Sequence, residues 1–272
     1  MRLVTYDSGS GPRAGALVDG GIADLDAPGG LGALLRAGGV PDGGGVAEAS
    51  VSLDDARLLP PVPDPEKIVC IGLNYRTHAE EAGLDPPEAP TYFAKFRNCL
   101  APPGASVELP SFSDKVDYEA ELAFVIGRRC KDVPEAEALD VVAGYTLLND
   151  LSARDYQFLT PQWGPGKAFD GSAPCGPALV TPDEGGDHDS IEIALTLNGE
   201  EMQRDTTASL IHSIPQLVAF LSKLMTLEPG DVVSTGTPAG VGSTRQPHVW
   251  LKPGDECVVE SPTLGRLETR LT

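Results

Sequence analysis

The chain consists of short apolar runs separated by turns that are rich in glycine and proline. From Lys67 onward these runs are KIVCIGLN, YEAELAFVIG, VVAGYTLLND, PALVT, IEIALTLNG, DVVSTG and DECVVES. Short apolar runs bounded by such turns predict β-strands. A helical pattern is clear only over residues 211–224 and is weaker over 76–82 and 134–141. The pattern therefore predicts a mostly β or α+β fold.

The first 60 residues predict a small module of their own. RLVTY, GALVDG and GIADLD have the pattern of short strands, with a hairpin turn at Asp19, Gly20 and Gly21, and LGALLRAGG has that of a short helix. The proline-rich segment PPVPDPEK is typical of a domain boundary. We therefore expect a small N-terminal α/β module at residues 1–60 and a main domain at residues 67–272.

The segment 116–126, VDYEAELAFVI, carries carboxylates in an apolar context. A single strand here puts the apolar even positions on one face and Asp117, Glu119 and Glu121, followed by Ala123 and Val125, on the other. A solvent face normally stays polar, so burial on both faces is expected. Two buried like charges repel each other, and a hard cation such as Mg²⁺, Mn²⁺ or Ca²⁺ removes that repulsion. The residues alone leave an exposed pair of glutamates on an edge strand as the alternative.

Composition and charge narrow the class of protein. The 272 residues are 41% hydrophobic, enough for a core, and carry a formal net charge of −20, which disfavours nucleic acid and anionic membranes as partners. No apolar stretch has the length of a membrane span, and the N-terminus lacks the apolar region of a secretory signal. The five cysteines are widely spaced, with no CxxC pair. These features predict a cytoplasmic protein with reduced thiols.

The segment NYRTHAEEAG offers a candidate catalytic pair. On a helical turn His78 and Glu81 share a face, and a carboxylate beside a histidine orients it as a base. Thr77 and Glu80 fit a capping box, and Gly83 is a suitable helix end. The alternative is a surface helix with an incidental histidine.

Several motifs in order resemble the fumarylacetoacetate hydrolase family. They are IGLNYRTHAEE, YFAKFRN, DYEAELAFVIGR, GYTLLNDLSARDYQ, GKAFDGSAPCGPALVTPDE, LNGEEMQRDTTASLIHSIPQLVAFLS and PGDVVSTGTPAGVG. The resemblance runs from about Lys67 to the C-terminus. It implies a mixed β-sandwich roll with the site at its mouth, following the small N-terminal α/β module, and a homodimer.

The resemblance also implies a set of site residues. Glu119, Glu121 and Asp150 are the implied ligands of Mg²⁺ or Mn²⁺, with Ca²⁺ as a substitute in crystals; Asp150 follows an apolar run and so lies at a strand end. His78 and Glu81 match the family's catalytic dyad. The other implied residues are Lys167 beside the enolate, Arg154 and Gln157 at the α-keto acid, and Thr237 and Tyr75 along the substrate pocket.

For Arg154, whose planar fork suits a carboxylate, the alternative is a salt bridge with Asp155 or with another of the many acidic residues. The distal group of the substrate depends on the loops 84–92 and 158–163, in which the residues show no decisive chemistry.

Together with the resemblance, these residues imply a Mg²⁺-dependent hydrolase that cleaves a carbon–carbon bond in a small diketo acid, acylpyruvate-like or fumarylpyruvate-like, through a metal-stabilised enolate. Two alternatives stay open. The first is a decarboxylase or isomerase of oxaloacetate-like or 2-hydroxyhepta-2,4-diene-1,7-dioate-like substrates in aromatic catabolism. The second is a catalytically silent, metal-stabilised binding protein. Hydrolysis, decarboxylation and isomerisation all need the same enolate stabilisation, so the residues alone do not choose among these reactions.

Overall fold

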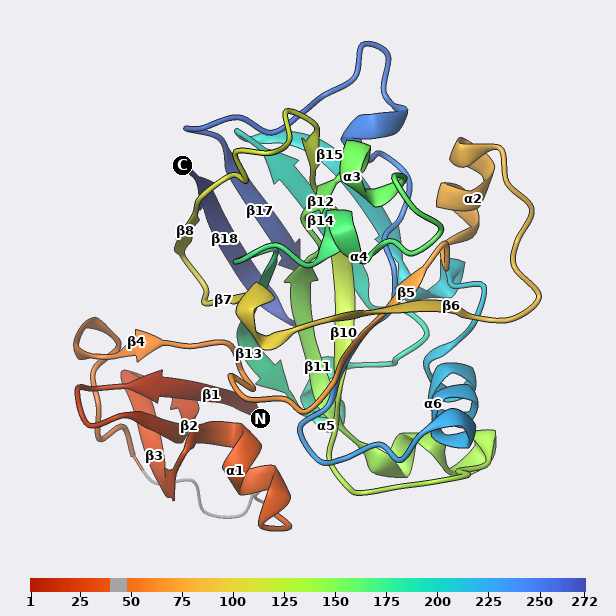
Figure 1. The fold of residues 1–272 in the computed structure, drawn as a ribbon. Helices are drawn as coiled ribbons and strands as arrows, with labels where there is room; N and C mark the ends of the chain where they lie inside the picture. The colour runs from red at the N-terminus through yellow and green to blue at the C-terminus, as the bar shows by residue number, and fades with distance from the viewer. Residues whose placement is uncertain (40–47) are drawn as a thin grey trace.

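The fold is mostly β, as the pattern predicts (Figure 1). The computed structural model describes residues 1–39 and 48–272. A large sheet holds, in order, β3 (Gly21–Pro28), β2 (Pro12–Val18), β1 (Arg2–Asp7), β13 (Ala173–Val180), β11 (Val142–Asn149), β10 (Ala120–Ile126), β16 (Val232–Ser234), β5 (Ile68–Gly72) and β6 (Thr91–Lys95). β4 (Arg57–Leu58) pairs with β1, and β7 (Leu100–Ala101) pairs with β13.

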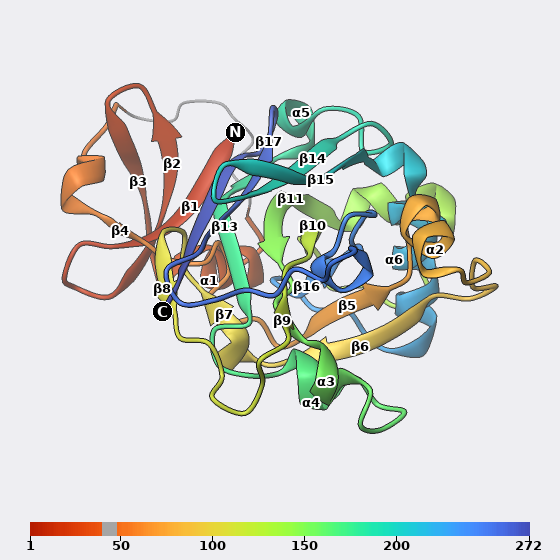
Figure 2. The ribbon, with the colours of Figure 1, turned by 90° about the horizontal axis from the view of Figure 1, so that it is seen from above.

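A second sheet covers one face of the first. It holds β15 (Glu200–Thr206), β14 (Glu192–Leu197), β17 (Glu256–Ser261), β18 (Gly265–Leu271) and β8 (Ala105–Val107). Strands β14, β17 and β18 pack on β10, β11 and β13, which gives the roll seen from above in Figure 2. A small sheet pairs β12 (Ser152–Ala153) with β9 (Val116–Asp117).

Strand β10 is buried on both faces, as its sequence predicts. Leu122 and Phe124 point into the core between the two sheets, whereas Ala123 and Val125 join a second apolar cluster that includes the N-terminal module. The prediction of one strand over 116–126 is wrong. The chain forms β9, breaks at residues 118–119 and resumes as β10, because β9 pairs with β12 and β10 pairs with β11.

The helices are short and lie around the sheets. They are α1 (Gly30–Arg36), α2 (Arg76–Ala82), α3 (Arg154–Gln157), α4 (Gly164–Lys167), α5 (Pro182–Gly185) and α6 (Ile214–Leu224). Short 3₁₀ turns are η1 (Leu53–Asp55), η2 (Arg97–Cys99), η3 (Glu135–Val141), η4 (Thr207–Ser209) and η5 (Gly242–Thr244). Helix α6 begins three residues later than the pattern predicts, because Ser213 and Gln216 form a capping box there. The segment predicted as a helix over 134–141 is the 3₁₀ turn η3.

The N-terminal module contains the predicted hairpin, β2 to β3, and the predicted helix α1. Residues 40–47 of the module lie outside the described part of the chain. Strand β1 pairs with β2 on one side and with β13 of the main domain on the other, so one sheet runs through both parts. Within the described ranges, we find no helix with the length and apolar character needed to cross a bilayer.

Candidate functional site

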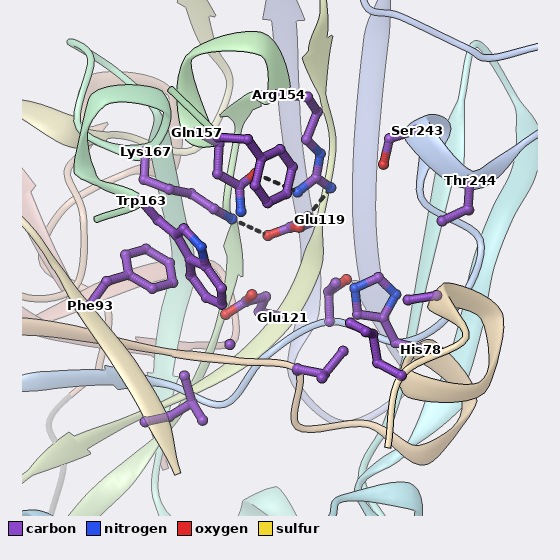
Figure 3. Close-up of a pocket in the computed structure, with 17 residues that line it drawn as sticks. His78, Phe93, Glu119, Glu121, Arg154, Gln157, Trp163, Lys167, Ser243 and Thr244 are labelled. Carbon is purple, nitrogen blue, oxygen red and sulfur yellow. Dashed lines mark hydrogen bonds and ion pairs between the residues drawn. The ribbon is translucent and has the colours of Figure 1, made fainter. Parts of the chain in front are cut away.

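A cavity of about 240 Å³ opens at one end of the roll, beside the ends of β5 and β10 (Figure 3). Its polar and charged lining residues are His78, Glu119, Glu121, Arg154, Gln157, Lys167, Thr237, Ser243 and Thr244, and its apolar ones are Ile71, Gly72, Leu73, Ala82, Leu84, Phe93, Phe158 and Trp163. The loops expected to shape the distal part of the pocket thus contribute Leu84, Phe158 and Trp163.

Two carboxylates, those of Glu119 and Glu121, line this cavity, and the buried carboxylate of Asp150 lies next to them without lining it. Glu119 immediately precedes β10, Glu121 lies on β10, and Asp150 follows the last residue of β11. The antiparallel pairing of Ala120 with Asn149 brings the two strand ends together. The candidate ligand oxygens of the three carboxylates all lie within 4.8 Å of one another, and all three side chains are buried.

Buried cations balance most of this negative charge. Lys167 Nζ lies 2.5 Å from Glu119 and 2.8 Å from Asp150, and Lys95 Nζ lies 2.8 Å from the other oxygen of Asp150. Arg154 lies 2.7 Å from Glu119. Lys95 was not among the predicted site residues. The only signal for it was a lysine in the apolar segment YFAKF, which also suits a surface strand.

The pKa values of Glu119 and Glu121 shift in opposite directions. Burial raises the pKa of Glu119, but the charges of Arg154 and Lys167 outweigh it and hold this pKa well below its ordinary value. Burial, and then the charges of Asp150 and Glu119, raise the pKa of Glu121 well above its ordinary value. Burial lowers the pKa of Lys167, yet Asp150 and Glu119 together raise it to about 12.

The carboxylate cluster fits a divalent cation. In the described ranges Glu121 forms no ion pair; its carboxylate accepts hydrogen bonds from the Ser234 hydroxyl and, at 3.2 Å, from the Gly236 amide. A buried carboxylate with two like charges beside it gains from a cation. The donor set is all oxygen, which hard ions such as Mg²⁺ and Mn²⁺ prefer.

Helix α2 carries the predicted dyad to the opposite wall of the cavity, where Figure 3 shows His78 across from Lys167 and Trp163. Nδ1 of His78 lies 3.6 Å from Glu81, and both oxygens of Glu81 accept from the Gly240 amide at 3.1 Å. Burial raises the pKa of Glu81, but the neighbouring His78 and the hydrogen bond from the Gly240 amide bring it below its ordinary value.

The predicted capping box on α2 is wrong. The helix begins at Arg76, so Thr77 lies inside it, and the Thr77 hydroxyl donates instead to Asp205 at 2.8 Å. Gly83 ends the helix with a left-handed backbone, φ 65°, as expected.

Arg154 on α3 does not pair with Asp155. Its Nε donates to Asp117 at 2.8 Å and its Nη1 donates to Gln157 at 3.0 Å, so Asp117 and Gln157 hold the guanidinium at the edge of the cavity (Figure 3). The local sequence pattern does not predict the contact between Asp117 and Arg154, because the two residues lie 37 positions apart.

Thr237 and Tyr75 occupy different surroundings. Thr237 lines the cavity, and its hydroxyl donates to the Ala120 carbonyl at 2.9 Å and accepts from Gln203 at 2.8 Å. Tyr75 is fully buried and is not a lining residue of this cavity. Burial, followed by the nearby charge of Glu121, raises the pKa of the Tyr75 hydroxyl.

The fold and the buried carboxylate cluster define a β-rich protein whose cavity, at the mouth of a roll, combines charged and apolar walls. The model of the family described as "Fumarylacetoacetate (FAA) hydrolase C-terminal" matches residues 67–272. The chain belongs to this family of enzymes, as the sequence motifs indicated.

The relatives of this chain are named for several different activities. A mitochondrial oxaloacetate tautomerase from Xenopus laevis is 41% identical over 98% of this chain and 89% of its own. The crystal structure of 5-carboxymethyl-2-hydroxymuconate delta-isomerase from Mycobacterium smegmatis matches with a TM-score of 0.85 and 34% identity, covering 100% of this chain and 99% of that one. Fumarylacetoacetate hydrolase from psychrophilic Exiguobacterium antarcticum matches with a TM-score of 0.85 and 31% identity, at the same coverages.

Proposed function

We propose that the chain is a Mg²⁺-dependent hydrolase that cleaves the carbon–carbon bond of a small acylpyruvate-like or fumarylpyruvate-like diketo acid. The observation that carries this proposal is the position of His78, 3.6 Å from Glu81, across the cavity from Glu119, Lys167 and Arg154 (Figure 3). A base thus faces a group of cations, and enolate chemistry requires this arrangement.

In this proposal Glu119, Glu121 and Asp150 hold the cation, which when bound polarises the keto oxygens as a Lewis acid. The fork of Arg154, with Gln157 beside it, binds the α-keto carboxylate. The apolar walls, which include Phe93 and Trp163, exclude bulk water around the substrate.

The reaction then needs one water molecule. His78 accepts a proton from that water, and the resulting hydroxide adds to the distal carbonyl carbon. The bond between this carbon and the methylene breaks, and its electron pair passes into the enolate of the pyruvate half. Lys167 stabilises the enolate oxygen by its charge. The proton returns to the methylene carbon, so that water and the diketo acid give pyruvate and a carboxylic acid.

The 41% identity to an oxaloacetate tautomerase supports a second candidate, the interconversion of the keto and enol forms of an oxaloacetate-like acid. Here His78 removes a proton from the carbon beside the keto group, and the same cations stabilise the enolate. No water adds and no carbon–carbon bond breaks. The relative named as an isomerase supports a third outcome of the same proton transfer, isomerisation of a dienedioate in aromatic catabolism.

The test compares the wild type with His78→Ala on acylpyruvates, oxaloacetate and dienedioates in the presence of Mg²⁺. We expect wild-type hydrolysis of an acylpyruvate, followed as release of pyruvate, and a loss of at least about 100-fold in kcat for His78→Ala, which is typical of a removed acid–base group. The control is His188→Ala, since His188 lies in a loop away from the cavity.

Each result on this panel has a distinct meaning. Enol–keto exchange of oxaloacetate without pyruvate release from any acylpyruvate replaces hydrolysis by the second candidate. A wild type that is inert on the whole panel indicates a catalytically silent binding protein. Full hydrolytic activity of His78→Ala contradicts the assignment of the base.

The metal site has a test of its own. In calorimetry, Glu119→Gln combined with Glu121→Gln should abolish binding of Mg²⁺ and Mn²⁺, because two of the three anionic ligands are lost. Unchanged binding contradicts the site.

We also infer a cytoplasmic homodimer. Large apolar side chains at the protein surface outside the cavity, among them Phe96 (61% exposed) and Phe112 (43% exposed), support an interface, and the five buried free thiols fit a reducing compartment. Light scattering at a mass of one chain would contradict the dimer.

A further inference from the structure

The segment that follows β16, residues 240–244, contacts both catalytic walls of the cavity. Its Gly240 amide donates to Glu81 of α2, the carboxylate that orients His78. Its Ser243 and Thr244 line the cavity beside Arg154. Figure 2 shows this blue segment between α2 and α3, the helices that carry His78 and Arg154.

One buried carboxylate, that of Asp117, fixes this segment and Arg154 at the same time. Its Oδ1 accepts from the Gly242 amide at 2.7 Å, and its Oδ2 accepts from the Ser243 amide at 3.0 Å and from Arg154 Nε at 2.8 Å. Asp117 is 0% exposed, so water does not substitute for any of these partners. Charge-assisted hydrogen bonds of this kind are the stronger class in proteins.

The packing around Gly242 leaves the segment little freedom to take another path. A Cβ at this position would lie 2.0 Å from the Val249 carbonyl oxygen and 2.7 Å from Asp117 Oδ1. The backbone therefore approaches the carboxylate as closely as only glycine allows.

We propose that Asp117 is a positioning residue that holds the substrate-binding Arg154 and the segment behind Glu81 and His78 in one fixed arrangement. This inference rests on the proposed function, in which Arg154 binds the α-keto carboxylate. Asp117 itself does not line the cavity; it acts through Arg154 on one side and through residues 240–244 on the other.

The chain offers a matched control for this role. Asp231 is 1% exposed, accepts from the Lys67 amide at 2.9 Å and from the Glu228 amide at 2.8 Å, and pairs with the Lys67 ammonium at 2.8 Å. It thus has the same kind of partners as Asp117, but none of them lines the cavity. Asp117→Asn and Asp231→Asn should both lower Tm, because each leaves buried donors without an anionic partner.

The two variants should differ in ligand binding. Oxalate, a planar dianion that resembles the enolate of an α-keto acid, is the probe, with Mg²⁺ present and calorimetry as the readout. We expect Asp117→Asn to weaken oxalate binding at least tenfold and Asp231→Asn to leave it within about twofold. Hydrogen exchange should rise in residues 240–244 and 76–82 of Asp117→Asn alone. If Asp117→Asn matches Asp231→Asn in both measurements, the proposal is overturned.

Failure of the proposed function gives a different result. If the wild type binds no oxalate and turns over no diketo acid, the function is wrong, and hydrogen exchange alone decides the positioning role by the same comparison. If Asp117→Asn does not fold, Arg154→Ala replaces it. Added guanidinium should restore oxalate binding to Arg154→Ala, since the Asp117 carboxylate remains to orient it; a lack of rescue overturns the proposal.

Discussion

At the scale of single residues, the site consists of charges that stabilise or destabilise one another. Glu119 and Asp150 each have a cationic partner, whereas among the described residues Glu121 accepts only neutral hydrogen bonds and lies beside two like charges. Without metal, the buried charge of Glu121 therefore destabilises the fold. Lys167 stabilises the fold, because its charge compensates the buried carboxylates of Glu119 and Asp150.

We predict opposite stability changes for two substitutions in the metal-free protein. Glu121→Gln should raise Tm, because it removes a buried charge that lacks a cation, and Lys167→Met should lower the free energy of unfolding by about 3 kcal/mol, because it leaves two carboxylates without their shared partner. Thermal unfolding in the presence of a chelator measures both. A lower Tm for Glu121→Gln would contradict this view of the site.

The pH dependence follows from the raised pKa of Glu121. Since the folded pKa lies above the ordinary value of 4.5, the folded protein retains a proton that the unfolded chain has already lost, and stability falls as pH rises from 4.5 through the folded pKa. The increase in Tm that Glu121→Gln causes should therefore be small at low pH and should grow as pH rises. A gain that does not change with pH would indicate another cause.

At the scale of elements, the cavity depends on how the segment from α3 to α4 rests against strand β5. The Trp163 ring, between these helices, lies over the end of β5, where a Cβ on Gly72 would come within 2.1 Å of it. Trp163 also meets Phe93 of β6 edge to face, with ring centroids 5.7 Å apart. The apolar wall thus requires a residue without a side chain at position 72.

Gly72→Ala should displace Trp163 and lower kcat/KM at least about tenfold, because an overpacked contact forces a side chain or the backbone to move. Tryptophan fluorescence should shift to the red as the ring moves toward water, while Trp250, the other tryptophan, lies outside the cavity. Gly164→Ala is the matched control, since a Cβ there meets nothing within 4 Å. Unchanged fluorescence and activity in Gly72→Ala would contradict the close contact.

At the scale of the whole molecule, the N-terminal module and the main domain share a sheet and an apolar cluster. Leu3 of β1 pairs with Leu179 of β13, and the cluster that contains Leu3 and Leu31 also contains Val125 and Leu148. Structure shared in this way makes the two parts unfold together.

Leu3→Ala should therefore destabilise the entire chain, by about 3 kcal/mol for a buried leucine. Both tryptophans lie in the main domain, so their fluorescence reports that part, while calorimetry reports the whole. We expect the two transitions to coincide at a lower midpoint than in the wild type. An N-terminal transition that separates from an unchanged main transition would show independent folding.

The local pattern of the sequence predicted the elements whose burial is uniform along the strand, such as β10, β11 and β16, and helix α2 within its observed bounds. It missed the break at residues 118–119, because strand pairing with β11 and β12 decides where β10 begins, and a single segment carries no information about its partners. The 3₁₀ turn at η3 was predicted as a helix because the two share nearly the same apolar spacing.

By itself, the sequence determined the family, the mostly β fold and the three carboxylates that the structure brings together, since ordered motifs and acidic residues within apolar runs are properties of local sequence. Only the tertiary structure decided which cations neutralise them. Lys95 reaches Asp150 and Asp117 reaches Arg154 across strands that are distant in the sequence. The energy of such contacts depends on distance and burial in three dimensions, and neither is encoded in the spacing of residues along the chain.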